Sequence, residues 1–196
     1  DKQIPTGGGL GGGSSDAATV LLALNVICGT QLAVGTLAEI GLGLGADVPL
    51  FVRGRNAWAE GVGEQLTPID LPPRYFVVVD PGVAVSTADL FQAPELTRNS
   101  PRMTIGDFVA GMGTANAFVP PVRARYPQVA AALDWLGEYG SACLSGSGGC
   151  GFVAVASAQQ AREIVRICPP PFRAYSAHSV DRSPLHAALE SFRSRQ

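Results

Sequence analysis

The feature that most constrains the fold is a glycine-rich loop that leads directly into an apolar helix. Six of the seven residues from 7 to 13 are glycine, and Ser14, Ser15 and Asp16 follow. Residues 17–27 are apolar and helix-forming, and Gly29 is a typical helix stop. Because serine and aspartate are common N-cap and first-turn residues, we expect the helix to begin at residues 14–16. A side-chain-free loop beside the unpaired amides of a helix N-terminus is typical of a phosphate-binding site.

Three other interpretations of this loop fit the residues less well. A flexible linker seldom runs straight into a capped apolar helix. The Walker A pattern requires a lysine where this chain has Ser14. Gly7, Gly9 and Gly12 meet the dinucleotide pattern, but a glycine run meets almost any glycine pattern. The preceding strand and the later acidic residue of a Rossmann unit are also missing from their expected places.

Composition narrows the class of protein. Of the 196 residues, 46% are hydrophobic and 15% are charged, which excludes a disordered chain. With a net charge of −2, the chain has no excess of basic residues with which to bind nucleic acid. The sequence also contains no apolar run of about 20 residues, so it predicts no membrane-spanning helix. Lys2 is the single lysine, so a mechanism that needs a lysine must use Lys2 or proceed without one. The four cysteines lack C-x-x-C and zinc-site spacing, and we expect them to be buried and reduced.

The rest of the pattern predicts a mixed α+β chain. We expect helices over residues 31–44, 105–112, 116–125, 128–139 and 158–167, and a short helix capped by Ser86 and Thr87. We expect strands over residues 50–52, 57–60, 75–79, 141–144, 150–156 and 172–179. A second glycine loop, residues 145–149, separates two of these strands. The elements suggest a small antiparallel sheet backed by helices, with a domain boundary in the proline-rich stretch 68–74.

The stretch from Ile4 to Ala18 resembles the P-x-x-x-G-L-G-S-S-A-A loop of the GHMP small-molecule kinases. The resemblance continues in the order of that family through residues 44–51, 59–64, 96–98, 144–148 and 183–186, so it spans essentially the whole chain. It implies the two-lobe α+β fold of these kinases. We expect a partial ATP-binding lobe at residues 1–70. The second lobe, at residues 71–196, is expected to be a ferredoxin-like antiparallel sheet with helices.

The resemblance also implies a reaction and the residues for it. It points to the branch that uses ATP and Mg²⁺ to phosphorylate the 2-hydroxyl of cytidine diphosphate methylerythritol in isoprenoid biosynthesis. Asp47 matches the catalytic aspartate, and its apolar neighbours predict partial burial. Thr87 and Phe91 match substrate-binding positions, with the Phe91 ring stacked on cytosine. The implied nucleotide-binding residues are Pro5, Gly7, Gly8, Gly9, Leu10, Gly11, Gly12, Gly13, Ser14 and Ser15.

Two further expectations follow from the resemblance. The second glycine loop is implied to pack against the first and hold it in place. In the family a lysine near the amino terminus pairs with the catalytic aspartate. The sequence begins downstream of that position and Lys2 matches a different one, so we expect the 196 residues alone to phosphorylate poorly or not at all. The apolar residues 117–119 replace an acidic stretch of the family, and we assign them no chemistry.

The expected partners are a small-molecule substrate, no nucleic acid and no membrane. We assign no metal-ligating residues, and we expect a monomer or weak homodimer in a bacterial cytoplasm. Two alternatives stay open at this point. One is another GHMP kinase, acting on homoserine or mevalonate, and the other is a nucleotide-binding fragment without catalysis. Turnover of the three alcohols distinguishes the kinases, and nucleotide binding without product identifies the fragment.

Overall fold

The computed structural model describes residues 4–109 and 115–195, and these form two compact units. The sheet unit comprises residues up to Leu10 together with Pro73–Ser179. The helical unit comprises Gly11–Pro72 together with Val180 onward. The chain therefore passes from one unit to the other inside the first glycine loop, between Leu10 and Gly11. Each unit is described by itself below.

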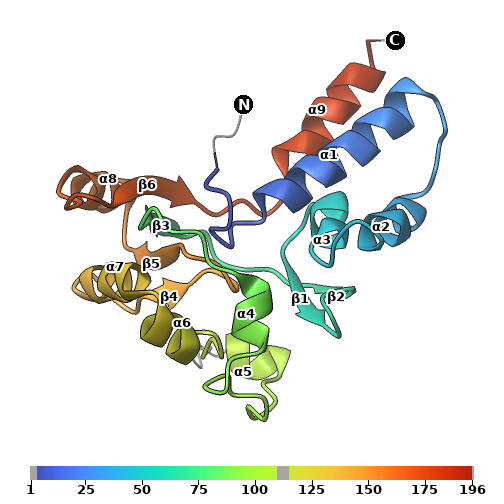
Figure 1. Cartoon of the computed structure of the whole chain (residues 1–196). Helices are drawn as coiled ribbons and strands as arrows, with labels where there is room; N and C mark the ends of the chain where they lie inside the picture. Colours follow the sequence, from blue (N-terminus) through green and yellow to red (C-terminus); the bar gives the residue numbers. More distant parts are fainter. Residues whose placement is uncertain (1–3, 110–114, 196) are drawn as a thin grey trace. The chain divides into compact units, whose positions relative to one another are not determined.

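The sheet unit is built on a four-stranded antiparallel sheet in the order β4-β5-β3-β6. Its strands are β3 (Tyr75–Asp80), β4 (Cys143–Leu144), β5 (Gly151–Val155) and β6 (Arg173–His178). Helices α7 (Pro127–Gly137) and α8 (Ala158–Arg166) pack against this sheet (Figure 1). The sequence β3-helices-β4-β5-α8-β6 with this strand order is the split βαβ arrangement of ferredoxin-like folds. The predicted α+β class and the predicted ferredoxin-like sheet are confirmed.

Strand alternation explains where the core of the sheet unit lies. Val77 and Val79 on β3 point to the same face, and Val77 pairs with Val153 on β5. All three side chains are fully buried. Leu136 of α7 and Ile164 of α8 pack against them in one cluster, so both helices cover this face of the sheet. On the other face, Phe76 and Phe152 meet edge to face with ring centroids 5.9 Å apart.

A long segment between β3 and β4 carries further short helices. These are α4 (Thr87–Phe91), α5 (Ile105–Val109) and α6 (Val119–Arg125). As predicted, Ser86 caps α4, its hydroxyl accepting a hydrogen bond from the Asp89 amide at 3.3 Å. Leu90 anchors α4 in a second buried cluster with Val122, Val129 and Leu133, so α4 is fixed to α6 and α7.

The helical unit packs three consecutive helices around a small apolar core. They are α1 (Gly12–Ile27), α2 (Val34–Leu42) and α3 (Val48–Arg53), and a hairpin of β1 (Ala57–Glu60) and β2 (Gln65–Pro68) follows. Ala18 and Leu22 of α1 meet Leu37 of α2 and Val48 and Val52 of α3 in this core. Ala18 and Leu22 are four residues apart, so they lie on one face of α1, and this face is the buried one.

The last helix, α9 (Pro184–Arg193), belongs to the helical unit and lies alongside α1 (Figure 1). The Ser183 amide donates a hydrogen bond to the Gly54 carbonyl at 2.9 Å. The His186 ring occupies the space that a side chain at Gly54 would need, and Gly54 has a φ of 62°. A glycine at this position therefore lets α9 dock against the end of α3.

Several predicted elements need correction. Residues 50–52 form part of α3 and not a strand. Phe51 and Val52 pack into the core shared with α1 and α2, and Pro49 suits the first turn of a helix. The first helix begins at Gly12, two residues before the predicted start, and Gly11 is its N-cap with a φ of 67°. Strand β2 and helix α9 were not predicted. The lobe boundaries at 1–70 and 71–196 stay a prediction.

Among the described residues, no helix combines the length and the apolar character that a membrane crossing requires.

Candidate functional site

The first part of the glycine loop is paired with the second glycine loop inside the sheet unit. The Gly149 amide donates to the Gly7 carbonyl at 3.1 Å, and the Cys150 amide donates to the Gly8 carbonyl at 3.0 Å. The Ser145 hydroxyl donates to the Gly9 carbonyl at 2.8 Å. These three bonds use carbonyls of the first loop, so they hold its backbone in one shape without occupying its amides.

The two loops approach so closely that only glycine fits at their contact. A Cβ on Gly9, whose φ is 74°, would lie 2.9 Å from the Gly148 nitrogen and closer still to the Ser145 carbonyl oxygen. A Cβ on Gly148 would collide with the backbone of Gly8 and Gly9. The glycines therefore permit backbone-to-backbone packing, and the second loop packs against the first as expected.

Cys150 lies directly beneath this contact. Its side chain is fully buried, and a Cβ on Gly8 would lie 2.7 Å from its sulfur. Burial, and secondarily the negative charge of Asp80, raise the pKa of the Cys150 thiol to about 12. Asp80 is itself buried and pairs with Arg173 at 2.8 Å. Cys150 is therefore a protonated packing residue and not a nucleophile.

The second part of the loop forms the start of α1 in the helical unit. The first amide of this helix with an intrahelical acceptor is that of Ser15, which donates to the Gly11 carbonyl at 2.9 Å. The amides of Gly12, Gly13 and Ser14 have no acceptor within the described part of the chain, and no side chain caps this helix. A Cβ on Gly13 would meet open space. Unpaired amides at the positive end of a 16-residue helix are well suited to an anion.

Asp47 directly precedes α3, which packs against α1 within the helical unit. It occupies the N-cap position of α3, and its side chain makes no capping hydrogen bond. Phe51, one helical turn later, places its ring 2.7 Å from where a Cβ on Gly11 would lie. The contact of Phe51 with the N-cap of α1 shows that α3 meets the start of α1. The predicted partial burial of Asp47 is wrong, because Val48 and Pro49 turn into the core while the carboxylate stays exposed.

Thr87 and Phe91 are carried by α4 in the sheet unit. The Thr87 hydroxyl is 2.8 Å from that of Ser147, which ties the start of α4 to the second glycine loop. The Phe91 side chain is 59% exposed, and its ring meets the Phe118 ring edge to face with centroids 5.2 Å apart. The Thr87 side chain therefore contacts the second glycine loop, and the Phe91 side chain presents an aromatic surface to solvent.

The predicted site residues thus fall into two groups. The sheet unit holds Pro5, Gly7 to Leu10, Thr87 and Phe91, and the helical unit holds Gly11 to Ser15 and Asp47. The bond between Leu10 and Gly11 joins the groups. Lys2 lies outside the described residues.

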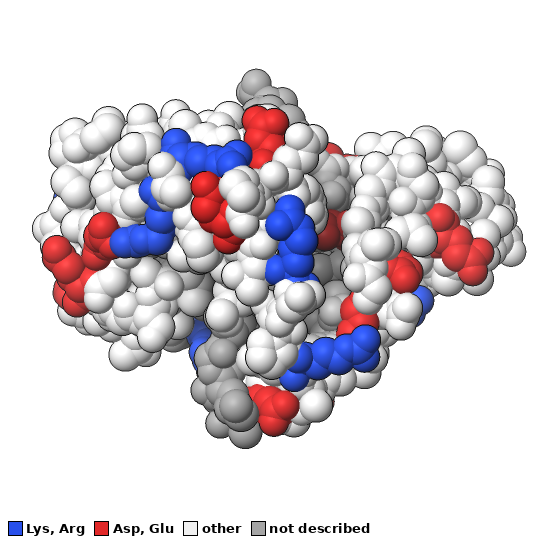
Figure 2. Space-filling model, turned by 60° about the horizontal axis from the view of Figure 1, so that its bottom comes forward, with Lys and Arg blue, Asp and Glu red and all other residues white. Residues whose placement is uncertain are grey.

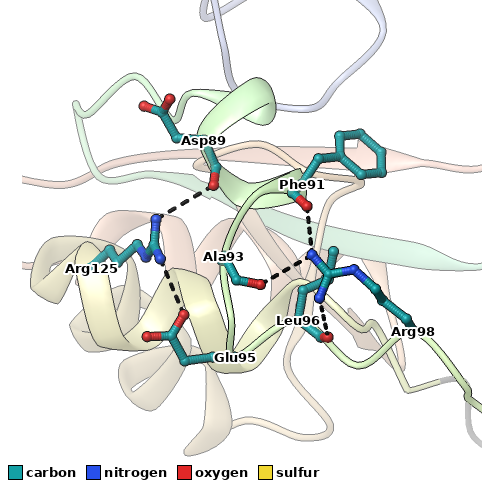
Figure 3. Close-up of polar contacts among 7 residues, drawn as sticks. All are labelled: Asp89, Phe91, Ala93, Glu95, Leu96, Arg98 and Arg125. Carbon is teal, nitrogen blue, oxygen red and sulfur yellow. Dashed lines mark hydrogen bonds and ion pairs between the residues drawn. The ribbon is translucent and has the colours of Figure 1, made fainter.

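Some supporting residues were missed by the sequence analysis. The Asn116 side-chain amide donates to the carbonyls of Leu144 at 3.1 Å and Gly146 at 2.7 Å, and so braces the second glycine loop. Arg98 and Arg125 contact α4 and the residues that follow it (Figure 3). An asparagine before an apolar helix and two surface arginines carry no local pattern that reveals such contacts.

Positive and negative side chains are mixed on one face of the molecule (Figure 2). On the face drawn in Figure 2, basic and acidic side chains are interspersed, with large uncharged areas between them. Within residues 4–109 and 115–195, no three His, Cys, Asp or Glu side chains gather as a metal-binding group. The features of the loop that attract an anion are the backbone amides at the start of α1 and the dipole of that helix.

Comparisons with known proteins agree with this geometry. The family model for the N-terminal domain of GHMP kinases matches residues 1–55, and the model for the C-terminal domain matches residues 100–170. A 4-diphosphocytidyl-2-C-methyl-D-erythritol kinase of Halorhodospira halophila is 53% identical over 96% of this chain and 66% of its own length. The same-named protein of Xanthomonas euvesicatoria is 52% identical over 97% of this chain and 65% of its own. The chain thus spans about 65% of the length of these relatives.

A solved structure shows the same likeness in three dimensions. It is described as the crystal structure of 4-(cytidine 5'-diphospho)-2C-methyl-D-erythritol kinase. It superposes with a TM-score of 0.74 at 33% identity, covering 91% of this chain and 68% of the other. The glycine loop, the second loop that braces it and these matches lead to one conclusion: the chain belongs to the GHMP kinase family.

Proposed function

We propose that this protein transfers the γ-phosphoryl group of ATP to the 2-hydroxyl of 4-diphosphocytidyl-2-C-methyl-D-erythritol. The observation that carries the proposal is the braced glycine loop. Its carbonyls are taken up by the second loop, and it leads to three unpaired amides at the start of α1. Relatives that carry this activity in their names are 52–53% identical to the chain.

The nucleotide phosphates are proposed to bind along Pro5, Gly7 to Gly13, Ser14 and Ser15. The amides of Gly12, Gly13 and Ser14 supply donors that need no rearrangement, since the helix already holds them in place. The open space at Gly13 lets an anion approach the backbone. ATP would supply the phosphoryl group, and a bound Mg²⁺ would supply positive charge to the phosphate oxygens.

The residues fit a magnesium ion held mainly by the nucleotide. Mg²⁺ commonly uses one or two protein ligands together with substrate phosphates and water. The Ser14 and Ser15 hydroxyls lie in the first turn of α1, where they are available as such ligands.

Asp47 is the proposed catalytic base. Phosphoryl transfer depends mostly on positioning and charge stabilisation, and the protein must also orient the attacking hydroxyl and accept its proton. Asp47 has a carboxylate that no capping bond occupies, on a short helix whose Phe51 ring packs at the N-cap of α1. A free, rigidly mounted carboxylate suits this role.

Thr87 and Phe91 are the proposed substrate-binding residues. Every nucleobase offers a π face, and an exposed aromatic ring on a fixed helix provides a surface for stacking. Thr87 is proposed to hydrogen-bond the substrate from the start of the same helix. We also propose that the protein works in the cytoplasm without nucleic acid or membrane partners, as a monomer or weak homodimer.

The test measures phosphate transfer from ATP with Mg²⁺ to three alcohols: the cytidylyl substrate, homoserine and mevalonate. We expect any phosphorylated product to come from the first alcohol and not from homoserine or mevalonate. Asp47→Asn should lower kcat by roughly 10²–10⁴ and leave KM for ATP nearly unchanged, because a general base acts in the chemical step.

The matched control is Asp70→Asn, which makes the same change at an exposed carboxylate in the same unit. It should keep full activity. Transfer to homoserine or mevalonate in place of the cytidylyl substrate would contradict the proposed substrate. ADP binding by calorimetry without any product would identify a nucleotide-binding fragment instead.

A further inference from the structure

Arg98 caps the segment that carries Phe91 by binding three backbone carbonyls at once. Its guanidinium donates to the carbonyl oxygens of Phe91 at 2.8 Å, Ala93 at 3.3 Å and Leu96 at 3.2 Å (Figure 3). The first of these carbonyls belongs to the last residue of α4, and the other two follow in the next turn. Arginine is suited to this because its planar group presents several donors in a fixed geometry.

These contacts matter because α4 is too short to hold its own end. The helix has five residues; its Leu90 carbonyl accepts a hydrogen bond from the Ala93 amide at 3.1 Å, and its last carbonyl, that of Phe91, is bound by Arg98. A cation at a helix C-terminus also interacts favourably with the helix dipole. Fixing the Phe91 carbonyl restricts the backbone and the direction of the Cα–Cβ bond, and the contact with the Phe118 ring restricts the rotation of the Phe91 ring about that bond. Figure 3 shows the ring pointing away from Arg98, so Arg98 leaves its surface free.

A second arginine supports the same segment from another direction. Arg125 of α6 donates to the Asp89 carbonyl at 3.4 Å and pairs with Glu95 at 3.2 Å (Figure 3). Its contact with the backbone of α4 is longer than that of Arg98, and it does not reach Phe91. We therefore expect Arg125 to matter less for the ring.

We propose that Arg98 is a positioning residue for base recognition: it fixes Phe91 so that the ring is preorganised to stack on the cytosine of the substrate. The inference rests on the proposed function, because it takes Phe91 as the base-stacking residue. Arg98 touches no reacting atom in this arrangement, so its effect falls on binding of the cytidylyl group and not on the chemical step.

The experiment measures affinity for cytidine 5'-diphosphate and for ADP by calorimetry, with KM and kcat as parallel readouts. Arg98→Ala should weaken binding of cytidine diphosphate about fivefold to tenfold. This loss is smaller than the whole affinity that a base gains by stacking on an aromatic ring, because the ring itself remains. ADP affinity and kcat should change less than twofold. Arg98→Lys should restore only part of the affinity, because a single ammonium group cannot bind three separate carbonyls.

Two comparisons separate positioning from general destabilisation. Arg162→Ala removes an exposed arginine on α8 in the same unit and should leave both affinities unchanged. In a double-mutant cycle, Arg98→Ala should have no further effect on cytidine diphosphate affinity once Phe91 is replaced by leucine, since Arg98 acts through that ring.

The outcomes are distinct. Equal weakening of both nucleotides, or additive effects of Arg98→Ala and Phe91→Leu, would overturn the positioning role and leave the proposed function intact. Wild-type protein that binds neither nucleotide would overturn the proposed function and this inference with it. Selective loss of cytidine diphosphate affinity that vanishes in the Phe91→Leu background supports both.

Discussion

Both units leave some large apolar side chains exposed, but the helical unit leaves more of them exposed than the sheet unit does. Val77, Val79 and Leu136 of the sheet unit have no accessible surface. In the helical unit, Val20, Leu24 and Ile27 are 56%, 51% and 65% exposed, although all three lie on α1 and belong to its apolar run. The apolar positions of α2 show the same tendency, with Val34 and Ile40 nearly half exposed.

The difference reflects how each unit uses its apolar residues. In a sheet covered by helices, alternation assigns every second residue to one buried face, and two helices are enough to cover it. Helix α1 is apolar around most of its circumference, so α2, α3 and α9 can bury only the stripe through Ala18 and Leu22. The fold of the sheet unit therefore depends on a closed core, and that of the helical unit on fewer buried contacts. The glycine loop joins the units, so its end in the sheet unit should tolerate added side-chain volume less well than its end in the helical unit.

The largest expected effect is at the end of the loop that lies in the sheet unit. Gly9→Val should destabilise the protein by about 4 kcal/mol, because the φ of 74° strains a branched residue and its side chain would collide with the second loop. Gly13→Ala, at the helical end, should be neutral or stabilising by about 0.5 kcal/mol, since the position is open and alanine favours a helix. Urea unfolding followed by circular dichroism measures both. Equal costs would show that the two ends of the loop are packed alike.

Sequence reasoning predicted well wherever the local pattern determines the outcome. The continuous apolar run at residues 75–79 became β3, Ser86 capped α4 as its position suggested, and the glycine loop led into an apolar helix. It failed where packing between distant segments decides. Residues 50–52 are a short apolar run that suits strand or helix equally, and contact with α1 and α2 selects the helix.

The site shows the same division. The glycine residues and Asp47 were identified from motifs, and the roles assigned to them stay proposals. The exposure of Asp47 was not foreseen, since its apolar neighbours in the sequence say nothing of which side of α3 faces solvent. Arg98 and Asn116 act on carbonyls several or many residues away, through contacts that only the folded chain creates.

A smaller expected effect concerns the dependence of stability on pH. Burial raises the pKa of the Cys150 thiol to about 12, whereas an unfolded thiol titrates near pH 8.5. Below that pH both states hold the proton and the stabilisation is complete. Between about pH 8.5 and 12 the unfolded state loses its proton first, so the free energy of unfolding should fall by up to about 1.4 kcal/mol per pH unit.

Comparison with Cys150→Ala isolates this contribution, because alanine does not titrate. Urea midpoints at pH 7.5, 9 and 10, measured under reducing conditions, should converge between the two proteins as pH rises. Cys28→Ala removes an exposed thiol of the helical unit and should leave the slope of the wild-type protein unchanged. Parallel curves for wild type and Cys150→Ala would contradict the burial of this thiol.

The smallest expected change in stability is on the exposed apolar stripe of α1, formed by Val20, Leu24 and Ile27. Leu24→Gln should alter the free energy of unfolding by no more than about 0.5 kcal/mol, because the side chain is already half exposed and glutamine is a good helix former. The same substitution should reduce binding of a hydrophobic fluorescent dye, which reports exposed apolar surface. Leu136→Ala in the core of the sheet unit should cost about 3 kcal/mol and serves as the reference for a buried leucine. If Leu24→Gln lowered the free energy of unfolding by nearly as much as Leu136→Ala, another surface would have to cover this stripe in the folded protein. The two units would then differ in what covers α1 and not in how tightly their residues pack.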